Sequence, residues 1–312
     1  MIVLGGDYEH TLGMGQSDED HAAGIVYKPQ ASPAGYFKLV LNRADFEAAE
    51  CSLSNYIMYR GNEDHWLTAI PVFPIRAFRY GDVVVRKDSA FHQFRDLVGK
   101  KVGVNDYSQT LAVWMRGCLS DEYDLNWRDV HWVSVANQRF VAPAGAKLTT
   151  TEKDLEDLLT AGEIDAVIKG PLRDSRKPPA ERQLRPLIDD PRGEEVRYFR
   201  RTGIFPIRHT VVIRREAYER EPKAAYAIFR SYAQAKKAAL QRRLGATFLP
   251  WGEQSWNDAE AIFGADSHPY GLTDANQRQA RKLVEYLVDQ GLMRRFVTLE
   301  ELFVPGSAEW QE

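Results

Sequence analysis

His209 stands directly before an apolar run in the stretch "GIFPIRHTVVIRRE". Two carboxylates hold comparable places, since Asp7 follows the apolar opening "MIVLGG" and Glu50 follows "DFEAA". An imidazole with an ordinary pKa of about 6.5 can donate or accept a proton at neutral pH, and a neighbouring carboxylate can orient it. We therefore predict that His209 carries acid/base chemistry, with Asp7 or Glu50 orienting it or taking the second proton-transfer role.

Other interpretations of these residues stay open. A lone histidine is more often structural than catalytic, and Glu50 could be a buried, paired structural carboxylate. Asp7, His10, Glu50 and His209 could also be interpreted as a metal set, but they lack helix-spaced or HxH ligand geometry. We expect no metal ligands here, with a divalent metal as the less favoured alternative.

Further candidates follow other apolar runs, in "ECSLSNYIMY", "PVFPIRAFRY", "NDYSQT" and "DAVIKG". A helix that starts in "NDYSQT" would offer free N–H groups and a positive dipole end to an anion, and cationic side chains can bind a carboxylate. Simpler roles are a helix cap for Ser108 or Thr110 and an ion pair for Arg76. The predicted substrate-binding residues are Ser52, Ser54, Phe73, Arg76, Tyr107, Ser108, Gln109, Thr110 and Lys169. Further cleft candidates are Tyr56 and Arg79 in the same stretches, and Tyr8 and His10 after the opening apolar run.

Strand-like and helix-like patterns alternate along the chain, which is typical of α/β layering. Strands are expected at 1–7, 36–42, 101–104, 165–170 and 209–215, and helices after 105, within 149–165 with Gly162 as the stop signal, and over 274–291. We predict one α/β lobe from residues 1–86 plus 205–312, with a second α/β lobe, residues 87–204, inserted in it. This is the plan of the periplasmic binding protein type II-like fold, in which a cleft between the two lobes holds the ligand.

Composition restricts the class of protein. The chain has 312 residues and a formal net charge of −3, so neither nucleic acid nor a membrane surface is an expected partner. The two cysteines make a poor disulfide framework, the N-terminus lacks the pattern of a signal peptide, and no apolar run approaches the length of a membrane span. We expect a cytoplasmic protein, and self-association fits a chain of this size. No GxGxxG, P-loop, GxSxG or CxxC motif is present, which disfavours nucleotide cofactors and serine-hydrolase chemistry.

Several long blocks resemble the 4,5-dihydroxyphthalate decarboxylase family. They are "AECSLSNYIMYRG", "IPVFPIRAFRY", "VGVNDYSQTLAVWMRGCLSDEY", "YFRRTGIFPIRHTVVIRRE", "HPYGL" and "TLEELFVP", in order from about Asp45 to Pro305. The resemblance implies a binding-protein fold turned to catalysis, which removes one carboxylate from 4,5-dihydroxyphthalate to give protocatechuate without an organic cofactor. The segment Glu9 to Tyr36 is the poorest match, so the loop "DYEHTLGMG" could accept a different aromatic acid.

Two other functions remain as alternatives. One is a cytoplasmic protein that binds or senses an aromatic acid in the cleft without chemistry. The other is a metal-dependent aryl-acid decarboxylase or hydrolase. Product formation separates the enzymes from the sensor, and chelation separates the two kinds of enzyme.

Overall fold

The computed structural model describes residues 1–31, 37, 39–40, 42–62, 64–135, 139–242 and 249–312. The chain divides into two compact units. Unit 1 comprises Met1–Arg76, Ile207–Arg281 and Val297–Glu312, and unit 2 comprises Ala77–Pro206 and Lys282–Phe296.

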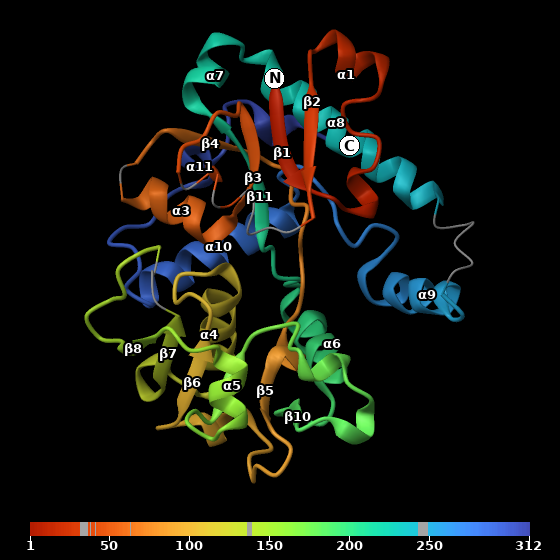
Figure 1. The fold of residues 1–312 in the computed structure, drawn as a ribbon. Helices are drawn as coiled ribbons and strands as arrows, with labels where there is room; N and C mark the ends of the chain where they lie inside the picture. The colour runs from red at the N-terminus through yellow and green to blue at the C-terminus, as the bar shows by residue number, and fades with distance from the viewer. Residues whose placement is uncertain (32–36, 38, 41, 63, 136–138, 243–248) are drawn as a thin grey trace. The chain divides into compact units, whose positions relative to one another are not determined.

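Unit 1 is built on a five-stranded sheet in the order β2-β1-β3-β11-β4 (Figure 1). Its strands are β1 (Ile2–Gly6), β2 (Val26–Gln30), β3 (Ala48–Ser52), β4 (Leu67–Ile70) and β11 (His209–Arg214). β1 runs parallel to β2 and β3, whereas β11 runs antiparallel to β3 and β4. The neighbouring strands β3, β11 and β4 are almost continuously buried, although β4 is the last strand of the order, which is why a period-two pattern is weak there.

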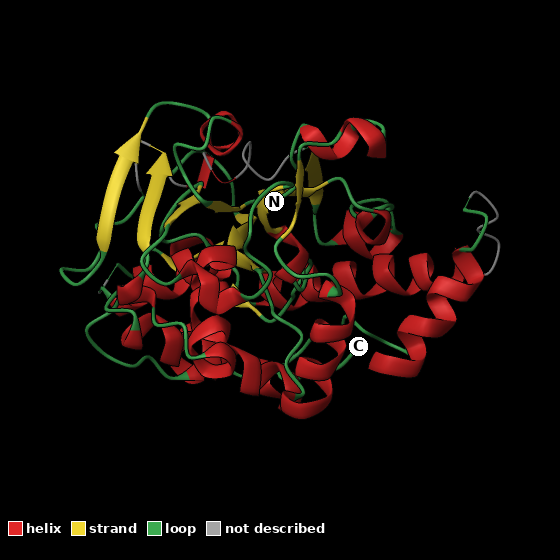
Figure 2. Cartoon of the chain, turned by 90° about the horizontal axis from the view of Figure 1, so that it is seen from below, coloured by secondary structure: helices red, strands yellow, loops and turns green. Residues whose placement is uncertain are grey.

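Unit 1 contains helices that pack on its sheet and one that lies apart from it. They are α1 (Asp18–Ala22), α3 (Leu53–Gly61), α7 (Arg215–Arg220), α8 (Lys223–Arg242), α9 (Gly252–Phe263) and α11 (Leu299–Leu302), with a 3₁₀ turn η1 (Glu9–Thr11). The long helix α8 buries Ile228, Phe229 and Tyr232 against Val3, Val211 and other strand residues. By contrast, α9 lies at the periphery, where only Gly252 of its residues is buried (Figures 1 and 2).

Unit 2 is built on a six-stranded sheet in the order β10-β5-β9-β6-β7-β8. Its strands are β5 (Val83–Arg86), β6 (Lys101–Val104), β7 (His131–Val135), β8 (Lys147–Thr151), β9 (Ala166–Ile168) and β10 (Leu184–Pro186). The helices are α4 (Thr110–Tyr123), α5 (Leu155–Thr160) and α6 (Pro191–Thr202). α6 has clear start and stop signals, because Asp190 accepts a hydrogen bond from the Gly193 N–H and Gly203 ends the helix in the left-handed region at φ 66°.

Helix α10 (Asp274–Asp289) supplies residues to both units, since the division falls between Arg281 and Lys282. Within unit 2 its last turns pack on α4: the Tyr286 hydroxyl donates to Asp121 over 2.8 Å, and Arg116 Nε donates to the Gln290 side chain over 2.8 Å. The helix ends before Gly291, which has a φ of +69°, as the sequence predicts.

The two-lobed α/β fold is as predicted, but the division of the chain differs from the predicted one. The predicted first lobe includes residues 77–86, whereas β5 pairs with β9 and β10 of the unit 2 sheet. It also includes residues 282–296, but their contacts with α4 put them in unit 2. The strand predicted over 36–42 is wrong where it can be compared, since Phe37, Leu39 and Val40 are helical and the residues 36, 38 and 41 lie outside the described ones.

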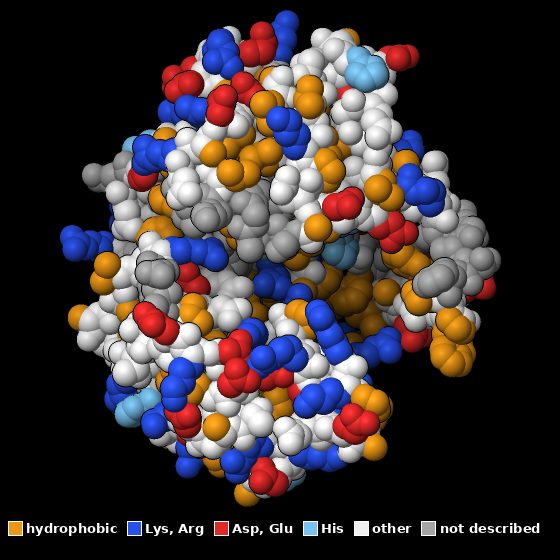
Figure 3. Space-filling model, viewed as in Figure 1, with side chains coloured by type: hydrophobic (Ala, Val, Ile, Leu, Met, Phe, Trp, Pro, Cys, Tyr) orange, Lys and Arg blue, Asp and Glu red, His pale blue; other side chains and the backbone are white. Residues whose placement is uncertain are grey.

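Surface chemistry agrees with a nearly balanced composition. Basic and acidic side chains are interspersed over the face drawn in Figure 3. Among the described residues, no helix combines the length and the apolar character that a membrane crossing requires.

The contact between α4 and α10 generates a stability prediction. A Cβ atom at Gly117 would overlap the ring of Tyr286, which is buried and tied to Asp121. Glycine to alanine within a helix ordinarily stabilises by about 1 kcal/mol, but overpacking costs about 1–3 kcal/mol. We expect Gly117→Ala to lower the free energy of unfolding, measured by urea denaturation, while Ser120→Ala in the same helix leaves it nearly unchanged. A Gly117→Ala protein as stable as the wild type would contradict this packing.

Candidate active site

Glu50 is a fully buried carboxylate on which three donors converge. Its Oε2 accepts from the Gly6 N–H over 3.0 Å, and its Oε1 accepts from the Tyr8 hydroxyl over 3.0 Å and lies 2.5 Å from His209 Nδ1. A carboxylate that accepts from all three of these partners places a proton on Nδ1 of His209. Nε2 is then the atom through which His209 can give or take a proton.

Strand register brings this pair together. β11 runs antiparallel to β3 with His209 opposite Ser52 and Val211 opposite Glu50. Residues two apart on a strand share a face, so Glu50 and His209 lie diagonally on the same face of the sheet. Both lie near the ends of their strands. The beginning of β11 therefore meets the end of β3, although Glu50 and His209 are 159 positions apart in the sequence. Among the described residues, Phe37 also contacts His209, with its ring edge-on at 5.0 Å.

Two glycines at the end of β1 make room for aromatic hydroxyls. A Cβ at Gly6 would overlap the Tyr8 ring, and a Cβ at Gly5 would overlap the Tyr27 hydroxyl. The Tyr27 hydroxyl donates to the Gly6 carbonyl over 2.7 Å, and Thr11 Oγ1 donates to the same carbonyl over 2.8 Å. These bonds fix the turn after β1 in the conformation in which the Tyr8 hydroxyl donates a hydrogen bond to Glu50.

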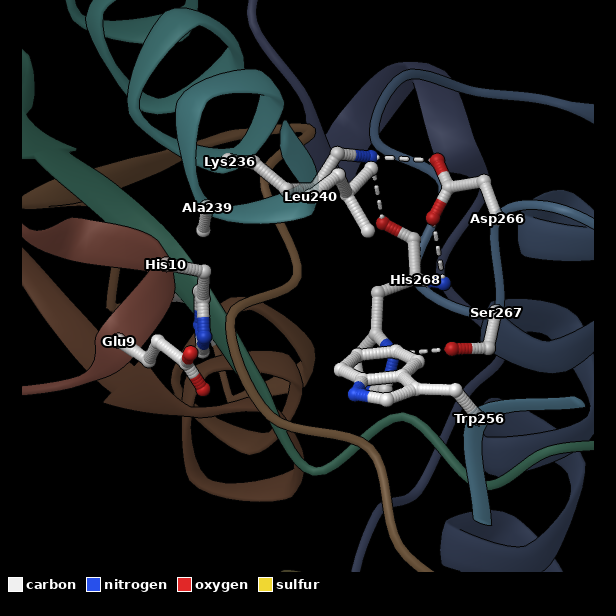
Figure 4. A pocket seen from close by; sticks show the side chains of 9 residues that line it. All are labelled: Glu9, His10, Lys236, Ala239, Leu240, Trp256, Asp266, Ser267 and His268. Atoms are coloured by element: carbon white, nitrogen blue, oxygen red, sulfur yellow. Dashed lines mark hydrogen bonds and ion pairs between the residues drawn. The ribbon is translucent and has the colours of Figure 1, made fainter. Parts of the chain in front are cut away.

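A cavity of about 170 Å³ lies beside this turn in unit 1. Its lining residues are Glu9, His10, Lys236, Ala239, Leu240, Trp256, Asp266, Ser267 and His268. Figure 4 shows His10 on one wall, Trp256 and His268 opposite it, and the α8 residues along a third side. The rings of His10 and His268 are 6.5 Å apart, and the His10 ring stacks on that of Tyr8 at 5.2 Å.

Charges around the cavity are largely compensated. Lys236 is buried and its Nζ lies 2.5 Å from Asp266 Oδ2, donates to the His268 carbonyl over 2.9 Å and also pairs with Glu312. Burial lowers the pKa of His10, with the charge of Glu50 acting in the opposite direction. Burial and, next, the charge of Arg76 lower the pKa of His268 to about 4. Both histidines are therefore neutral at physiological pH.

Arg76 is a buried cation held by neutral acceptors. Its guanidinium donates to the Asn276 side chain over 2.6 Å, to the Pro269 carbonyl over 2.9 Å and to Gln279 over 3.3 Å. Burial lowers its pKa to about 10. These bonds tie the segment after β4 to α10 and to the "HPYGL" segment, so Arg76 contributes a charge near His268 from a fixed position.

The other predicted residues are distributed over both units. Asp7 has an exposed side chain, and within the described residues it makes no hydrogen bond to Glu50 or His209. Ser52 and Ser54 are buried close to the pair, with their hydroxyls 3.4 Å apart, and Phe73 is buried edge-on against Phe303.

The predicted residues of the second lobe all lie in unit 2. Tyr107 is buried against the Arg116 guanidinium, 3.8 Å from the ring centre, and Ser108 donates to Asp106 through both its N–H and its hydroxyl. Gln109 is the N-cap residue of α4, and Thr110 is its first, buried residue. Lys169 pairs with Asp154 over 3.3 Å and borders a hollow of about 300 Å³.

The possible metal set Asp7, His10, Glu50 and His209 can be compared with the structure. Across the described ranges, no three histidine, cysteine or carboxylate side chains are arranged as a group that could hold a metal ion.

Of the residues that line the cavity, sequence reasoning named only His10 as a candidate, and it gave no role to polar or aromatic ones such as Lys236, Trp256, Asp266 and His268. One signal for His268 was present, since it begins the block "HPYGL". Lys236 sits in the middle of a helix, where a lysine is ordinarily solvated, so its burial could not be predicted from the pattern. Tyr8 and His10 were among the candidates, and the structure links both to Glu50.

Two α/β units, each with a mixed sheet flanked by helices, define the periplasmic binding protein-like fold. The aliphatic sulphonate binding protein SsuA from Escherichia coli superposes with a TM-score of 0.59 at 14% identity, over 98% of this chain and 97% of that chain. A Candida albicans protein described as having the generic periplasmic binding protein fold gives a TM-score of 0.57 at 10% identity, over 100% and 98% of the two chains. These likenesses establish the fold.

The family follows from sequence comparison. The chain is 31% identical over 291 residues to a 4,5-dihydroxyphthalate decarboxylase from Comamonas testosteroni, covering 89% of this chain and 88% of that protein. It is 30% identical over 178 residues to the enzyme of the same name from Pseudomonas putida, covering 54% of this chain and 69% of the relative. No family model matches the chain. The chain belongs to the 4,5-dihydroxyphthalate decarboxylase family.

The lowered pKa of His268 predicts a pH dependence of stability. In the unfolded chain His268 takes up a proton near its ordinary pKa of 6.5, whereas in the folded chain it stays neutral down to about 4. Between pH 6.5 and about 4 the unfolded chain therefore binds more protons than the folded chain. The stability that depends on a neutral His268 is fully present above pH 6.5, and it is lost as the pH falls toward 4. Between neutral pH and pH 4.5 we expect the free energy of unfolding of His268→Gln to fall less than that of the wild type. The difference between the two losses should be at most about 3 kcal/mol. Urea denaturation at the two pH values measures this, and equal losses for the two proteins would contradict it.

Proposed function

We propose that this chain decarboxylates an aromatic carboxylic acid, with 4,5-dihydroxyphthalate as substrate and protocatechuate and CO₂ as products. The substrate is taken from the names of the two relatives, which match the chain at 31% and 30% identity. The observation that carries the proposal is the buried Glu50–His209 pair, joined at 2.5 Å. Such a pair holds a proton at a fixed place, which is what this reaction requires.

The reaction replaces a carbon–carbon bond by a carbon–hydrogen bond. A hydroxyl para to the leaving carboxylate pushes electron density toward the ring carbon that bears it. His209 Nε2 delivers a proton to that carbon, the bond to the carboxylate breaks, and its electron pair returns to the ring as CO₂ leaves. His209 is left neutral and regains its proton from solvent, so no electrons are exchanged with a cofactor.

Glu50 has two tasks in this scheme. Its negative charge stabilises the imidazolium form of His209 before proton transfer, and its hydrogen bond to Nδ1 fixes the ring so that Nε2 is the donating atom. The N–H of Gly6 and the hydroxyl of Tyr8 keep the carboxylate in place. Because these partners come from β1 and the turn after it, the first residues of the chain help to position the acid.

The proposed reaction uses no organic cofactor and no metal, and we propose a cytoplasmic location for the enzyme. Each element supplied by the protein is a proton donor, an acceptor or a fixed charge. Activity of chelator-treated protein tests the metal component separately from the residues.

Substitution of His209 tests the role of the pair. We expect His209→Asn to lower the rate of CO₂ and protocatechuate formation from 4,5-dihydroxyphthalate by about 10²–10⁴-fold, the usual contribution of a positioned acid or base. Asparagine can still donate a hydrogen bond to Glu50, so the fold should survive. His21→Asn is the matched control, because His21 is exposed on α1.

Three outcomes separate the candidate functions. Full activity of His209→Asn would remove His209 from the reaction. Activity that disappears with chelator and returns with a divalent ion would replace the acid/base scheme by a metal-dependent one. Binding of the aromatic acid without product, in the wild type and with any divalent ion, would indicate a sensor.

A further inference from the structure

One oxygen of Glu50 is shared by two hydrogen-bond donors. Oε1 accepts from the Tyr8 hydroxyl over 3.0 Å and lies 2.5 Å from Nδ1 of His209, whereas the Gly6 N–H donates to the other oxygen, Oε2, over 3.0 Å. A carboxylate oxygen has lone pairs for two donors, so both bonds to Oε1 can form at once. The two donors then draw on the same negative charge, and what Glu50 offers to His209 depends on Tyr8.

The Tyr8 hydroxyl is held in this place by its own turn. The Tyr8 N–H donates to Thr11 Oγ1 over 3.0 Å, and the Tyr8 ring stacks on the ring of His10, with centres 5.2 Å apart and 15° between the planes. The ring also occupies the space that a Cβ at Gly6 would need. The hydrogen bond to Glu50 is therefore a fixed feature of unit 1, unlike that of a tyrosine free to rotate in solvent.

This bond should lower the proton affinity of His209. A carboxylate at hydrogen-bond distance favours the protonated form of a histidine, and a second donor on the same oxygen takes up part of the charge that produces this effect. A hydrogen bond to a charged group changes an equilibrium constant by about ten- to a hundredfold, of which a part reaches His209 through Oε1. A general acid works best with a pKa near the working pH, so a limit on this proton affinity favours proton transfer.

Other ionisable side chains lie within electrostatic reach of Glu50. They are Tyr27 of β2, Tyr232 of α8, Tyr270 of the "HPYGL" segment and His10 of η1. Burial raises the pKa of each of these three tyrosines, so their hydroxyls stay neutral, and burial lowers the pKa of His10. Along the chain, Arg208 beside His209 is a permanent cation, and Asp7 beside Tyr8 has an exposed side chain.

We propose that Tyr8 is a positioning residue whose hydroxyl limits how firmly Glu50 holds the protonated form of His209, so that Nε2 releases its proton near neutral pH. Tyr8 keeps its own proton throughout and forms no bond to the substrate. The effect on His209 is a property of the protein without ligand, whereas its use in catalysis rests on the proposed function.

Histidine NMR signals followed across a pH titration test this assignment without turnover. Tyr8→Phe keeps the stacked ring and removes the donor, so we expect the pKa of His209 to rise by about 0.5–1 unit. Tyr27→Phe is the matched control, because the Tyr27 hydroxyl donates to the Gly6 carbonyl and not to Glu50. The control should leave the pKa of His209 nearly unchanged, and the signals of His209→Asn identify the resonance.

A second variant keeps the test sharp if Tyr8→Phe folds poorly. Site-specific replacement of Tyr8 by 3-fluorotyrosine retains the hydroxyl and makes it a stronger donor, because the ring fluorine acidifies the phenol. This protein should show a lower pKa of His209 than the wild type. No shift in either variant, a shift in the opposite direction, or an equal shift in Tyr27→Phe overturns the inference.

The pH profile of decarboxylation distinguishes this role from a structural one. His209 acts in its protonated form, so activity should fall as the pH rises through its pKa, and in Tyr8→Phe this fall should move to higher pH by the amount that NMR measures. Lower activity at every pH with an unmoved profile contradicts the assignment.

The role of Tyr8 and the proposed function can fail separately. If the wild type does not decarboxylate 4,5-dihydroxyphthalate but the NMR shifts are found, the proposed function fails and the role of Tyr8 in setting the proton affinity of His209 stands. If the wild type decarboxylates this acid but the pKa of His209 is the same in Tyr8→Phe, the proposed function stands and the role of Tyr8 fails.

Discussion

A fully buried carboxylate is stable only when hydrogen-bond donors replace the water that it has lost. Glu50 is such a group, and its donors come from three separate places: the end of β1, the turn that follows it, and the first residue of β11. Leaving one charged partner buried and unpaired would cost about 3–5 kcal/mol. The requirement to satisfy Glu50 therefore fixes the relative positions of β1, β3 and β11, and with them the site.

The same requirement explains features that look unrelated. The glycine pair at the end of β1 allows Tyr8 and Tyr27 to approach the strand end, and the antiparallel direction of β11 brings the histidine to the carboxylate. Away from Glu50 the cavity holds neutral histidines and a lysine whose charge is compensated. Unit 1 thus contains the buried Glu50–His209 pair and a cavity lined in part by the charged residues Glu9, Lys236 and Asp266, and both adjoin the turn after β1.

Much of this arrangement could be predicted from sequence. The position of His209 at the beginning of a strand follows from the apolar run that starts beside it. The alternation of strand-like and helix-like patterns indicates the two-lobed α/β fold. The partner of His209 could not be chosen, since Asp7 and Glu50 both follow apolar runs; only the register of β11 on β3 selects Glu50. The unit boundary was missed because a short run such as "DVVVRK" carries no information about which sheet it joins. Lys236 and His268 were missed because their roles depend on contacts between segments that are distant in sequence.

Histidine ¹⁵N NMR of the wild-type protein and of Glu50→Gln measures the central interaction directly. We expect Nδ1 of His209 in the wild type to carry a proton protected from exchange. This signal should be lost or become rapidly exchanging in Glu50→Gln, while the signal of His21 is unchanged. A His209 whose Nδ1 is unprotonated in the wild type, or whose protected proton persists in Glu50→Gln, would contradict the claim that the buried carboxylate holds the ring of His209.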